Sequence, residues 1–175
     1  CIFVRQAEQL GLGHAVLCAE RAVAGEPFAV LLADDFLTDY TAGVTTDLVG
    51  AFEKTGISQI SVMPVDEAYI SQYGAVIPSA DGGGVIGLIE KPRQDEAPSN
   101  LASIGRYVLS PDIFDTLRAL PIGSGGEIQL ADALNLHAQA GLIESIELQG
   151  KRFDCGSVDG FMSATAYEYA KRLGK

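Results

Sequence analysis

Two acidic residues follow an apolar segment early in the chain and could bind a cation. Phe28 to Leu32 is continuously apolar, and Asp34 and Asp35 come just after it. Ligands of open α/β sheets bind beyond the carboxyl ends of the strands. Carboxylate oxygens at that edge are suitable ligands for a hard cation. The same pair is also typical of a solvated turn, and the pattern alone favours the turn.

A third acid could complete such a site from the far end of the chain. Asp154, in Phe153-Asp154-Cys155-Gly156, follows a short apolar-to-polar transition and precedes a helical segment. This position could place Asp154 at the same edge of the sheet as Asp34. The alternative is that Asp154 caps the following helix, and its spacing alone favours capping.

An acidic and a basic residue stand at a bend in the middle of the chain. Glu90-Lys91-Pro92 ends a strand-like segment, and the proline restricts the conformation of the residue before it. A lysine at such a bend can contact a phosphate group. The alternative is an exposed ion pair, which contributes little free energy, and the residues alone favour this alternative.

Other motifs are weaker. Gly11-Leu12-Gly13 precedes a helical segment and offers backbone amides to a ligand, but it lacks the third glycine of the dinucleotide fingerprint. Cys155 has no obvious histidine partner, so we interpret it as structural. The three cysteines and two histidines are widely spaced and form neither a disulfide framework nor a zinc pattern.

The elements that would position these residues predict an α/β fold. The chain alternates a helix at 15–24, a strand at 28–32 buried on both faces of a parallel sheet, a helix ending at Gly56 and a strand at 59–64. The later part predicts three short strands at 73–78, 85–90 and 103–109 and one further strand at 143–148. It also predicts three helices, at 110–117, 127–140 and 160–173. No repeat or linker divides the chain, so we expect one domain over residues 1–175.

Composition excludes several classes of function. The chain has 175 residues and a formal net charge of −11, which would repel nucleic acids and anionic membranes. No apolar run approaches the roughly 20 residues that span a bilayer, and the start does not read as a signal peptide. We therefore expect a cytoplasmic protein with neither a nucleic-acid nor a membrane partner.

Nine ordered blocks together resemble one family. The chain is similar over essentially its whole length to the bacterial UTP–glucose-1-phosphate uridylyltransferases, which are sugar nucleotidyltransferases. The resemblance implies a nucleotidyltransferase (Rossmann-like) α/β fold with a mixed, mainly parallel sheet. It also implies transfer of a uridylyl group from UTP to glucose 1-phosphate. The blocks are 3–6, 11–17, 27–34, 73–74, Glu90-Lys91-Pro92, 99–102, 105–109, Gly126-Glu127-Ile128-Gln129-Leu130 and 154–156.

The same resemblance implies a role for each site residue. Asp34 and Asp154 would share a Mg²⁺ ion, and Lys91 would bind the sugar phosphate, so Lys91 and Asp34 would be catalytic. Gly74 and Glu90 would hold the glucosyl hydroxyls. The uracil would be recognised by Gln6 and by the backbone of Gly13.

The chain departs from the family pattern in two respects. Ala33 replaces a proline, and the extra acid Asp35 leaves open which carboxylate leads at the metal. Family members also begin with roughly a hundred further residues, including a glycine-rich loop around the triphosphate, against a usual domain size near 150. We therefore expect the 175-residue chain alone to be a poor catalyst.

A second hypothesis explains the absent loop. The chain would be a truncated, non-catalytic module that binds sugar phosphate or nucleotide and associates with itself through an exposed sheet edge. A homo-oligomer is expected in either case. A purely structural interaction protein ranks last, because it gives no reason for Asp34, Glu90-Lys91 and Asp154 to occur together.

Overall fold

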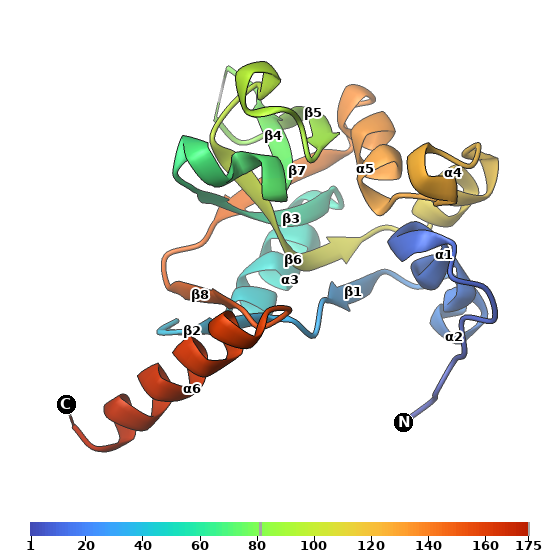
Figure 1. Ribbon diagram of the computed structural model, residues 1–175. Helices are drawn as coiled ribbons and strands as arrows, with labels where there is room; N and C mark the ends of the chain where they lie inside the picture. Colours follow the sequence, from blue (N-terminus) through green and yellow to red (C-terminus); the bar gives the residue numbers. More distant parts are fainter. Residues whose placement is uncertain (81, 175) are drawn as a thin grey trace.

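The computed structural model describes residues 1–80 and 82–174 and has helices on both faces of one mixed sheet (Figure 1). The strands are β1 Phe28–Leu31, β2 Asp35–Thr38, β3 Ser58–Pro64, β4 Gly74–Pro78, β5 Val85–Glu90, β6 Leu101–Leu109, β7 Ile143–Glu147 and β8 Lys151–Asp154. The helices are α1 Gly11–Cys18, α2 Glu20–Val23, α3 Val44–Thr55, α4 Ile113–Ala119, α5 Leu130–Gln139 and α6 Val158–Arg172, with 3₁₀ turns η1 Glu67–Gln72, η2 Gln94–Glu96 and η3 Ser124–Gly126.

The long strand β6 organises the main sheet. The strand order is β5-β4-β6-β3-β7, and β1 also pairs with β6, beyond the point where β4 leaves it. The remaining strands, β2 and β8, form a separate antiparallel ribbon. The expected mixed α/β architecture is therefore confirmed.

The pairings inside this sheet are less parallel than the sequence predicted. β3 and β7 are parallel, whereas the pairs of β6 with β1, β3 and β4 and the β4–β5 hairpin are antiparallel. For the β4–β5 hairpin the reason is local connectivity, because the two strands are joined by a short connection that can only reverse the chain. The apolar pattern indicates strands but not their direction.

The prediction that the strand after Pro27 is buried on both faces is wrong. In the described part of the chain β1 pairs only with β6. Its side chains alternate in burial, and Leu31 is 55% exposed. A continuous apolar run does not reveal how many neighbouring strands a segment has, so its burial was overestimated.

Two apolar clusters fix the sheet between its helices. One cluster joins Val16 of α1, Leu117 of α4 and Leu134 of α5 to the sheet, and Phe28 stacks on Phe114 at its margin with ring centroids 4.9 Å apart. The other joins Val44 and Leu48 of α3 to the opposite face. Helices covering both faces are typical of α/β architecture.

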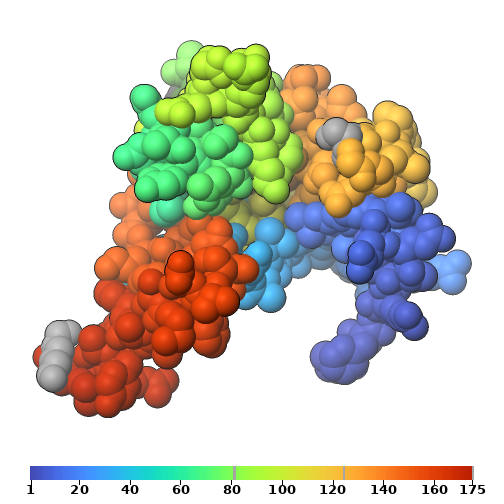
Figure 2. Space-filling model, in the orientation of Figure 1, coloured from blue at the N-terminus to red at the C-terminus, as the bar shows by residue number. Residues whose placement is uncertain are grey.

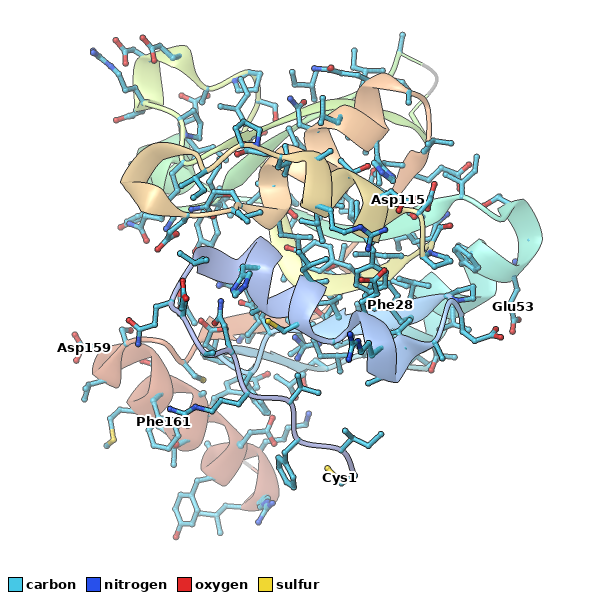
Figure 3. The ribbon with its side chains drawn as sticks, turned by 90° about the vertical axis from the view of Figure 1, so that its right-hand side faces the viewer. Cys1, Phe28, Glu53, Asp115, Asp159 and Phe161 are labelled. Atoms are coloured by element: carbon cyan, nitrogen blue, oxygen red, sulfur yellow. The ribbon has the colours of Figure 1, made fainter. Side chains whose placement is uncertain are left out.

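The last helix stands apart from these clusters. Figure 3 shows α6, where Asp159 and Phe161 are labelled, extending away from the helices that cover the sheet. Ser157 caps it by accepting a hydrogen bond from the Gly160 amide at 3.1 Å. Thr38 at the end of β2 donates to Glu168 Oε1 at 2.6 Å, and Lys171 pairs with Asp39. Polar contacts thus hold α6 on the β2–β8 ribbon.

We predict that Gly105→Ala destabilises the protein, because β6 has no room for a methyl group at this position. A Cβ on Gly105 would lie 2.5 Å from Asp35 Oδ2 and 2.6 Å from Leu32 Cβ. We expect the free energy of unfolding to fall by about 1–3 kcal/mol in urea titrations.

Gly50→Ala is the matched control. A Cβ on Gly50 meets no atom within 4 Å, and the residue lies inside α3. This variant should gain up to about 1 kcal/mol through helix propensity. A Gly105→Ala protein as stable as the wild type would contradict the proposed close packing of β6 against Asp35.

Candidate functional site

A polar cavity of about 480 Å³ lies where the β2–β8 ribbon, the β4–β5 hairpin and the helices α1 and α5 meet. Five of the residues predicted from the sequence line it: Asp34, Gly74, Glu90, Lys91 and Asp154. An apolar hollow of about 380 Å³ along α6, lined by Phe36 and Phe161 among others, contains none of them. The polar cavity is therefore the candidate site.

Pairing in the ribbon brings the distant acids together. Asp35 lies opposite Asp154 in the β2–β8 register, and the Cys155 amide donates to the Asp34 carbonyl at 2.7 Å. A Cβ placed on Gly156 would lie 3.1 Å from Asp154 Oδ1 and 3.3 Å from Asp34 Oδ2. The carboxylates of Asp34 and Asp154 therefore lie beside the same small space, as the resemblance implied, whereas spacing alone favoured Asp154 as a helix cap, a position that Ser157 takes.

The neighbouring acid Asp35 has a different role. Its side chain is buried, accepts a hydrogen bond from the Gly105 amide at 2.7 Å and pairs with Arg152 Nε. Arg106 also donates to the Asp35 carbonyl oxygen at 2.6 Å. These contacts commit the Asp35 carboxylate to the interior. Asp34 is exposed, so of the two carboxylates it is the one that a cation could reach.

The residues present fit a magnesium ion that takes part of its coordination from elsewhere. Over residues 1–80 and 82–174, no group of three or more His, Cys, Asp or Glu side chains is arranged to hold a metal. Mg²⁺, however, is commonly bound by one or two carboxylates together with substrate phosphates and water. Asp34 and Asp154 match this donor set. Arg152 Nη2 lies 3.4 Å from Asp154 Oδ2 and restrains that carboxylate.

The β4–β5 hairpin and the residue that follows it, Lys91, also line the cavity. Gly74 is paired with Glu90, and a Cβ on Gly74 would lie only 3.3 Å from Glu90 Oε2. Any larger residue would crowd the carboxylate, so a glycine at this position leaves space beside Glu90. A ligand hydroxyl could occupy that space.

The backbone of Lys91 adopts an uncommon conformation. Its φ is +43°, and its amide donates to the Tyr73 carbonyl at 3.0 Å. Non-glycine residues held at positive φ are found preferentially at functional sites. The Lys91 side chain is 65% exposed, and its Nζ is 4.0 Å from Glu90 Oε1, at the limit of an ion pair. The ammonium group is therefore free to meet an anion in the cavity.

Burial is the main cause of a raised pKa for Glu90. The side chain is 32% exposed, and its removal from water raises the pKa above the ordinary 4.5. Lys91 opposes this effect, and Asp132 adds to it. Because burial removes water from the Glu90 carboxylate, it would readily accept a hydrogen bond from a hydroxyl group of a ligand.

Gln6 and Gly13 do not line the cavity, although Gly11 and Leu12 do. Gln6 Nε2 donates to the Gly11 carbonyl at 3.0 Å and lies 2.9 Å from His14 Nδ1. The Gly13 amide donates to the Ile128 carbonyl at 2.9 Å, and a Cβ there would lie 2.7 Å from the same oxygen. Gly13 thus lets α1 approach the segment before α5 closely. Its amide is already hydrogen-bonded within the protein. Recognition of a base by these two residues stays a prediction.

Sequence reasoning gave no role to several other residues of the cavity. Arg152 is the most connected of them, and its alternation with Asp154 on β8 could have indicated that both point to the same face. Glu127 and Gln129 are joined by a 2.6 Å hydrogen bond at the entrance to α5. Tyr107 is a further lining residue, and burial raises its pKa to about 12.

The chain resembles proteins of one family in sequence and in structure. The model of the nucleotidyl transferase family matches residues 2–171. A UTP–glucose-1-phosphate uridylyltransferase of Pseudomonas aeruginosa is 40% identical over 179 residues, covering 99% of this chain and 64% of the relative. The enzyme of the same name from Escherichia coli K12 is 44% identical over 171 residues, covering 92% of this chain and 56% of the relative.

Solved structures give the same result. A UDP-glucose pyrophosphorylase complexed with UDP-glucose superimposes with a TM-score of 0.92 at 39% identity, over 97% of this chain and 66% of that chain. A UTP-bound UGPase from Acinetobacter baumannii has a TM-score of 0.83 at 36% identity, over 96% of this chain and 59% of that chain. The chain thus spans about three fifths of the length of the curated relatives it matches.

We predict that Asp35→Asn destabilises the protein much more than Asp34→Asn. Removing the Asp35 charge leaves Arg152 buried without its main partner, which costs about 3–5 kcal/mol. Asp34 is exposed, so its substitution should change stability by about 0.5 kcal/mol or less. Urea unfolding of both variants measures the difference. Equal losses would contradict the structural role assigned to Asp35.

We predict that the contribution of Glu90 to the free energy of unfolding increases as the pH falls through the raised pKa of this carboxyl group. The folded state binds this proton at a higher pH than the unfolded state, so stability rises as the pH decreases toward 4.5. A carboxyl NMR titration gives the pKa directly. Urea unfolding from about pH 7 to about pH 4 should show the effect in the wild type and not in Glu90→Gln, because glutamine does not titrate. A wild-type Glu90 titrating at or below its ordinary value would contradict the prediction.

Proposed function

The chain belongs to the nucleotidyl transferase family, and from this premise we propose that it carries the sugar-phosphate and metal-binding side of a UTP–glucose-1-phosphate uridylyltransferase. The reaction would join UTP and glucose 1-phosphate to give UDP-glucose and pyrophosphate. The similar proteins named UTP–glucose-1-phosphate uridylyltransferase support this substrate pair. So does the likeness to a pyrophosphorylase complexed with UDP-glucose.

The observation that carries the proposal is the placement of two kinds of group in one cavity. The carboxylates of Asp34 and Asp154 lie beside the same small space, and Glu90 and Lys91 line the same cavity. The acid pair could hold a cation beside a phosphate, the Glu90 carboxylate could accept hydrogen bonds from sugar hydroxyls, and the Lys91 ammonium group could contact the phosphate. Together these groups match the parts of a sugar phosphate. Lone capping acids and a surface ion pair would have no reason to share a cavity.

The reaction forms one bond and breaks one. An oxygen of the glucose 1-phosphate phosphate attacks the α-phosphorus of UTP, and the bond from that phosphorus to the bridging β-phosphate oxygen breaks as pyrophosphate leaves. Phosphoryl-type transfers need little covalent chemistry from the protein but need alignment and charge compensation. The residues of the cavity are suited to those two tasks.

Each residue would act by binding or orienting. Lys91 would contact the sugar phosphate as a compact positive charge, and Glu90 would accept hydrogen bonds from glucosyl hydroxyls in the space left by Gly74. Asp34 and Asp154 would hold a Mg²⁺ ion, which would offset the charge of the phosphates when bound. By the resemblance alone, Gln6 and the backbone of Gly13 would recognise the uracil.

An assay for UDP-glucose with UTP, glucose 1-phosphate and Mg²⁺ tests the proposal, together with calorimetry using glucose 1-phosphate and UDP-glucose. Product formation supports the uridylyltransferase. Binding without turnover favours the non-catalytic module. A chain that binds neither compound contradicts both.

Other properties stay predictions from the sequence. In the part of the chain that the structure describes, none of the helices is both long and apolar enough to cross a membrane. We retain a cytoplasmic location as a proposal on the same footing as the homo-oligomer. Self-association is supported by the edge of β1, which has no second partner strand among the described residues and exposes Leu31.

We predict that removing the Lys91 ammonium lowers the affinity for glucose 1-phosphate by about tenfold or more, because a charge-assisted contact is lost. Calorimetry should compare Lys91→Ala with Lys91→Gly, since glycine accepts the positive φ and alanine does not. Similar losses in both variants assign the effect to the charge. Lys54→Ala, at an exposed lysine of α3, is the control. Unchanged affinity in both Lys91 variants would make the residue a surface ion-pair partner only.

We predict that Asp34→Asn weakens Mg²⁺ binding more than Asp35→Asn does. Asp34 is exposed beside Asp154, whereas the Asp35 carboxylate is already bonded to Arg152 and Gly105. Binding should be measured at a temperature where both variants are folded, with Asp95→Asn as a control at an exposed acid. Equal effects of the Asp34 and Asp35 substitutions would show that the wrong acid was chosen.

A further inference from the structure

Arg152 contacts three side chains from three different segments around the cavity. Its Nε donates to Asp35 Oδ1, its Nη1 donates to Tyr73 Oη at 2.7 Å, and its Nη2 lies 3.4 Å from Asp154 Oδ2. The Arg152 side chain is only 9% exposed. A planar guanidinium presents these donors in a fixed fork, so the three partners are held at set positions relative to one another.

The contact with Tyr73 reaches the segment that leads into the β4–β5 hairpin, which lines the same cavity. The guanidinium carbon lies 4.9 Å from the centre of the Tyr73 ring. The Tyr73 carbonyl accepts the amide hydrogen bond of Lys91, and the next residue, Gly74, is paired with Glu90. Tyr73 therefore stands at the base of the residues that would bind the sugar phosphate.

Compensation of the buried Asp35 charge explains only one of these contacts. A hydrogen bond to a neutral tyrosine adds nothing to charge balance, yet at 2.7 Å it is shorter than the 3.4 Å contact between Arg152 and the Asp154 carboxylate. This contact links the ribbon that carries the acids to the hairpin that carries Lys91. A purely charge-balancing arginine would not need it.

We propose that Arg152 is a positioning residue that sets the separation between the acid pair, Asp34 and Asp154, and the sugar-phosphate group of Gly74, Glu90 and Lys91. The inference rests on the proposed function, because it assigns phosphate and sugar to the second group. Transfer between two bound phosphates depends steeply on their alignment, and displacement by about 1 Å can cost a hundredfold in rate. Lysine would keep the charge at this position but would lose the fork.

The test compares Tyr73→Phe, Arg152→Lys and the double variant. Tyr73→Phe removes only the hydroxyl and leaves the Asp35–Arg152 pair intact, so it tests the link even if Arg152→Lys folds poorly. Calorimetry measures glucose 1-phosphate affinity, and NMR hydrogen exchange measures the Lys91 amide, a readout that needs no ligand. Tyr69→Phe, at an exposed tyrosine of η1, is the control.

We expect each single variant to lose about tenfold in affinity and to exchange the Lys91 amide about tenfold faster. The double variant should be no worse than the worse single variant, because both substitutions remove the same contact. Tyr69→Phe should match the wild type in both measurements.

Two results would overturn the positioning role. One is unchanged Lys91 exchange in Tyr73→Phe, whatever the affinity. The other is a double variant whose losses multiply, because independent effects show that the residues do not act through one contact. A wild-type chain that binds no glucose 1-phosphate, while Tyr73→Phe still speeds Lys91 exchange, would refute the proposed function and leave the link between Arg152 and Lys91 supported.

Discussion

A buried ion pair between Asp35 and Arg152 joins the two strands of the small β2–β8 ribbon, and each of its two residues also bonds to a residue beside or within the main sheet. Asp35 also accepts the Gly105 amide of β6, and Arg152 also donates to Tyr73 before β4. Burying two charges costs free energy that is recovered only when the remaining hydrogen-bonding groups are satisfied. Here the Asp35 carboxylate also accepts the Gly105 amide, and the Arg152 guanidinium also donates to Tyr73. The same contacts fix the ribbon relative to β4 and β6. The geometry of the candidate site depends on these contacts of Asp35 and Arg152.

The Asp35–Arg152 ion pair explains why two adjacent acids have different roles. Asp35 points inward to Arg152, so Asp34 stays at the surface beside Asp154. Alternation along the chain near a strand sends neighbouring side chains to opposite sides. A buried acid and an exposed acid are therefore produced by one short segment, and only the exposed one is available to a cation.

The site itself is assembled at a margin of the molecule. Figure 2 shows a deep notch between the N-terminal segment (blue) and α6 (red). The polar cavity uses residues from the ribbon, the hairpin and the start of α5, and none of these elements alone carries both kinds of group. Strain at Lys91, with φ of +43°, is maintained by the hairpin and by its bond to Tyr73. The surrounding pairing thus fixes the backbone from which the Lys91 side chain extends beside the cavity.

The sequence by itself determined the α/β class, most of the elements and the identity of five cavity residues. Apolar runs and turn residues act locally, so β3, β7 and α6 were found close to their true bounds. The block resemblance supplied the roles that spacing alone left open for Asp34, Asp154 and Lys91. Ordered blocks carry such information because each preserves a local structure around a site residue.

Only the tertiary structure decided how these parts combine. Strand direction and neighbours depend on contacts between distant segments, which is why β1 was expected to be buried on both faces and is half exposed. The choice between Asp34 and Asp35 needed the position of Arg152, which is 117 residues away from Asp35. The link from Arg152 to Tyr73 also joins residues far apart in sequence. Such pairings are set by packing and by the need to satisfy buried charge, and neither can be read from local sequence.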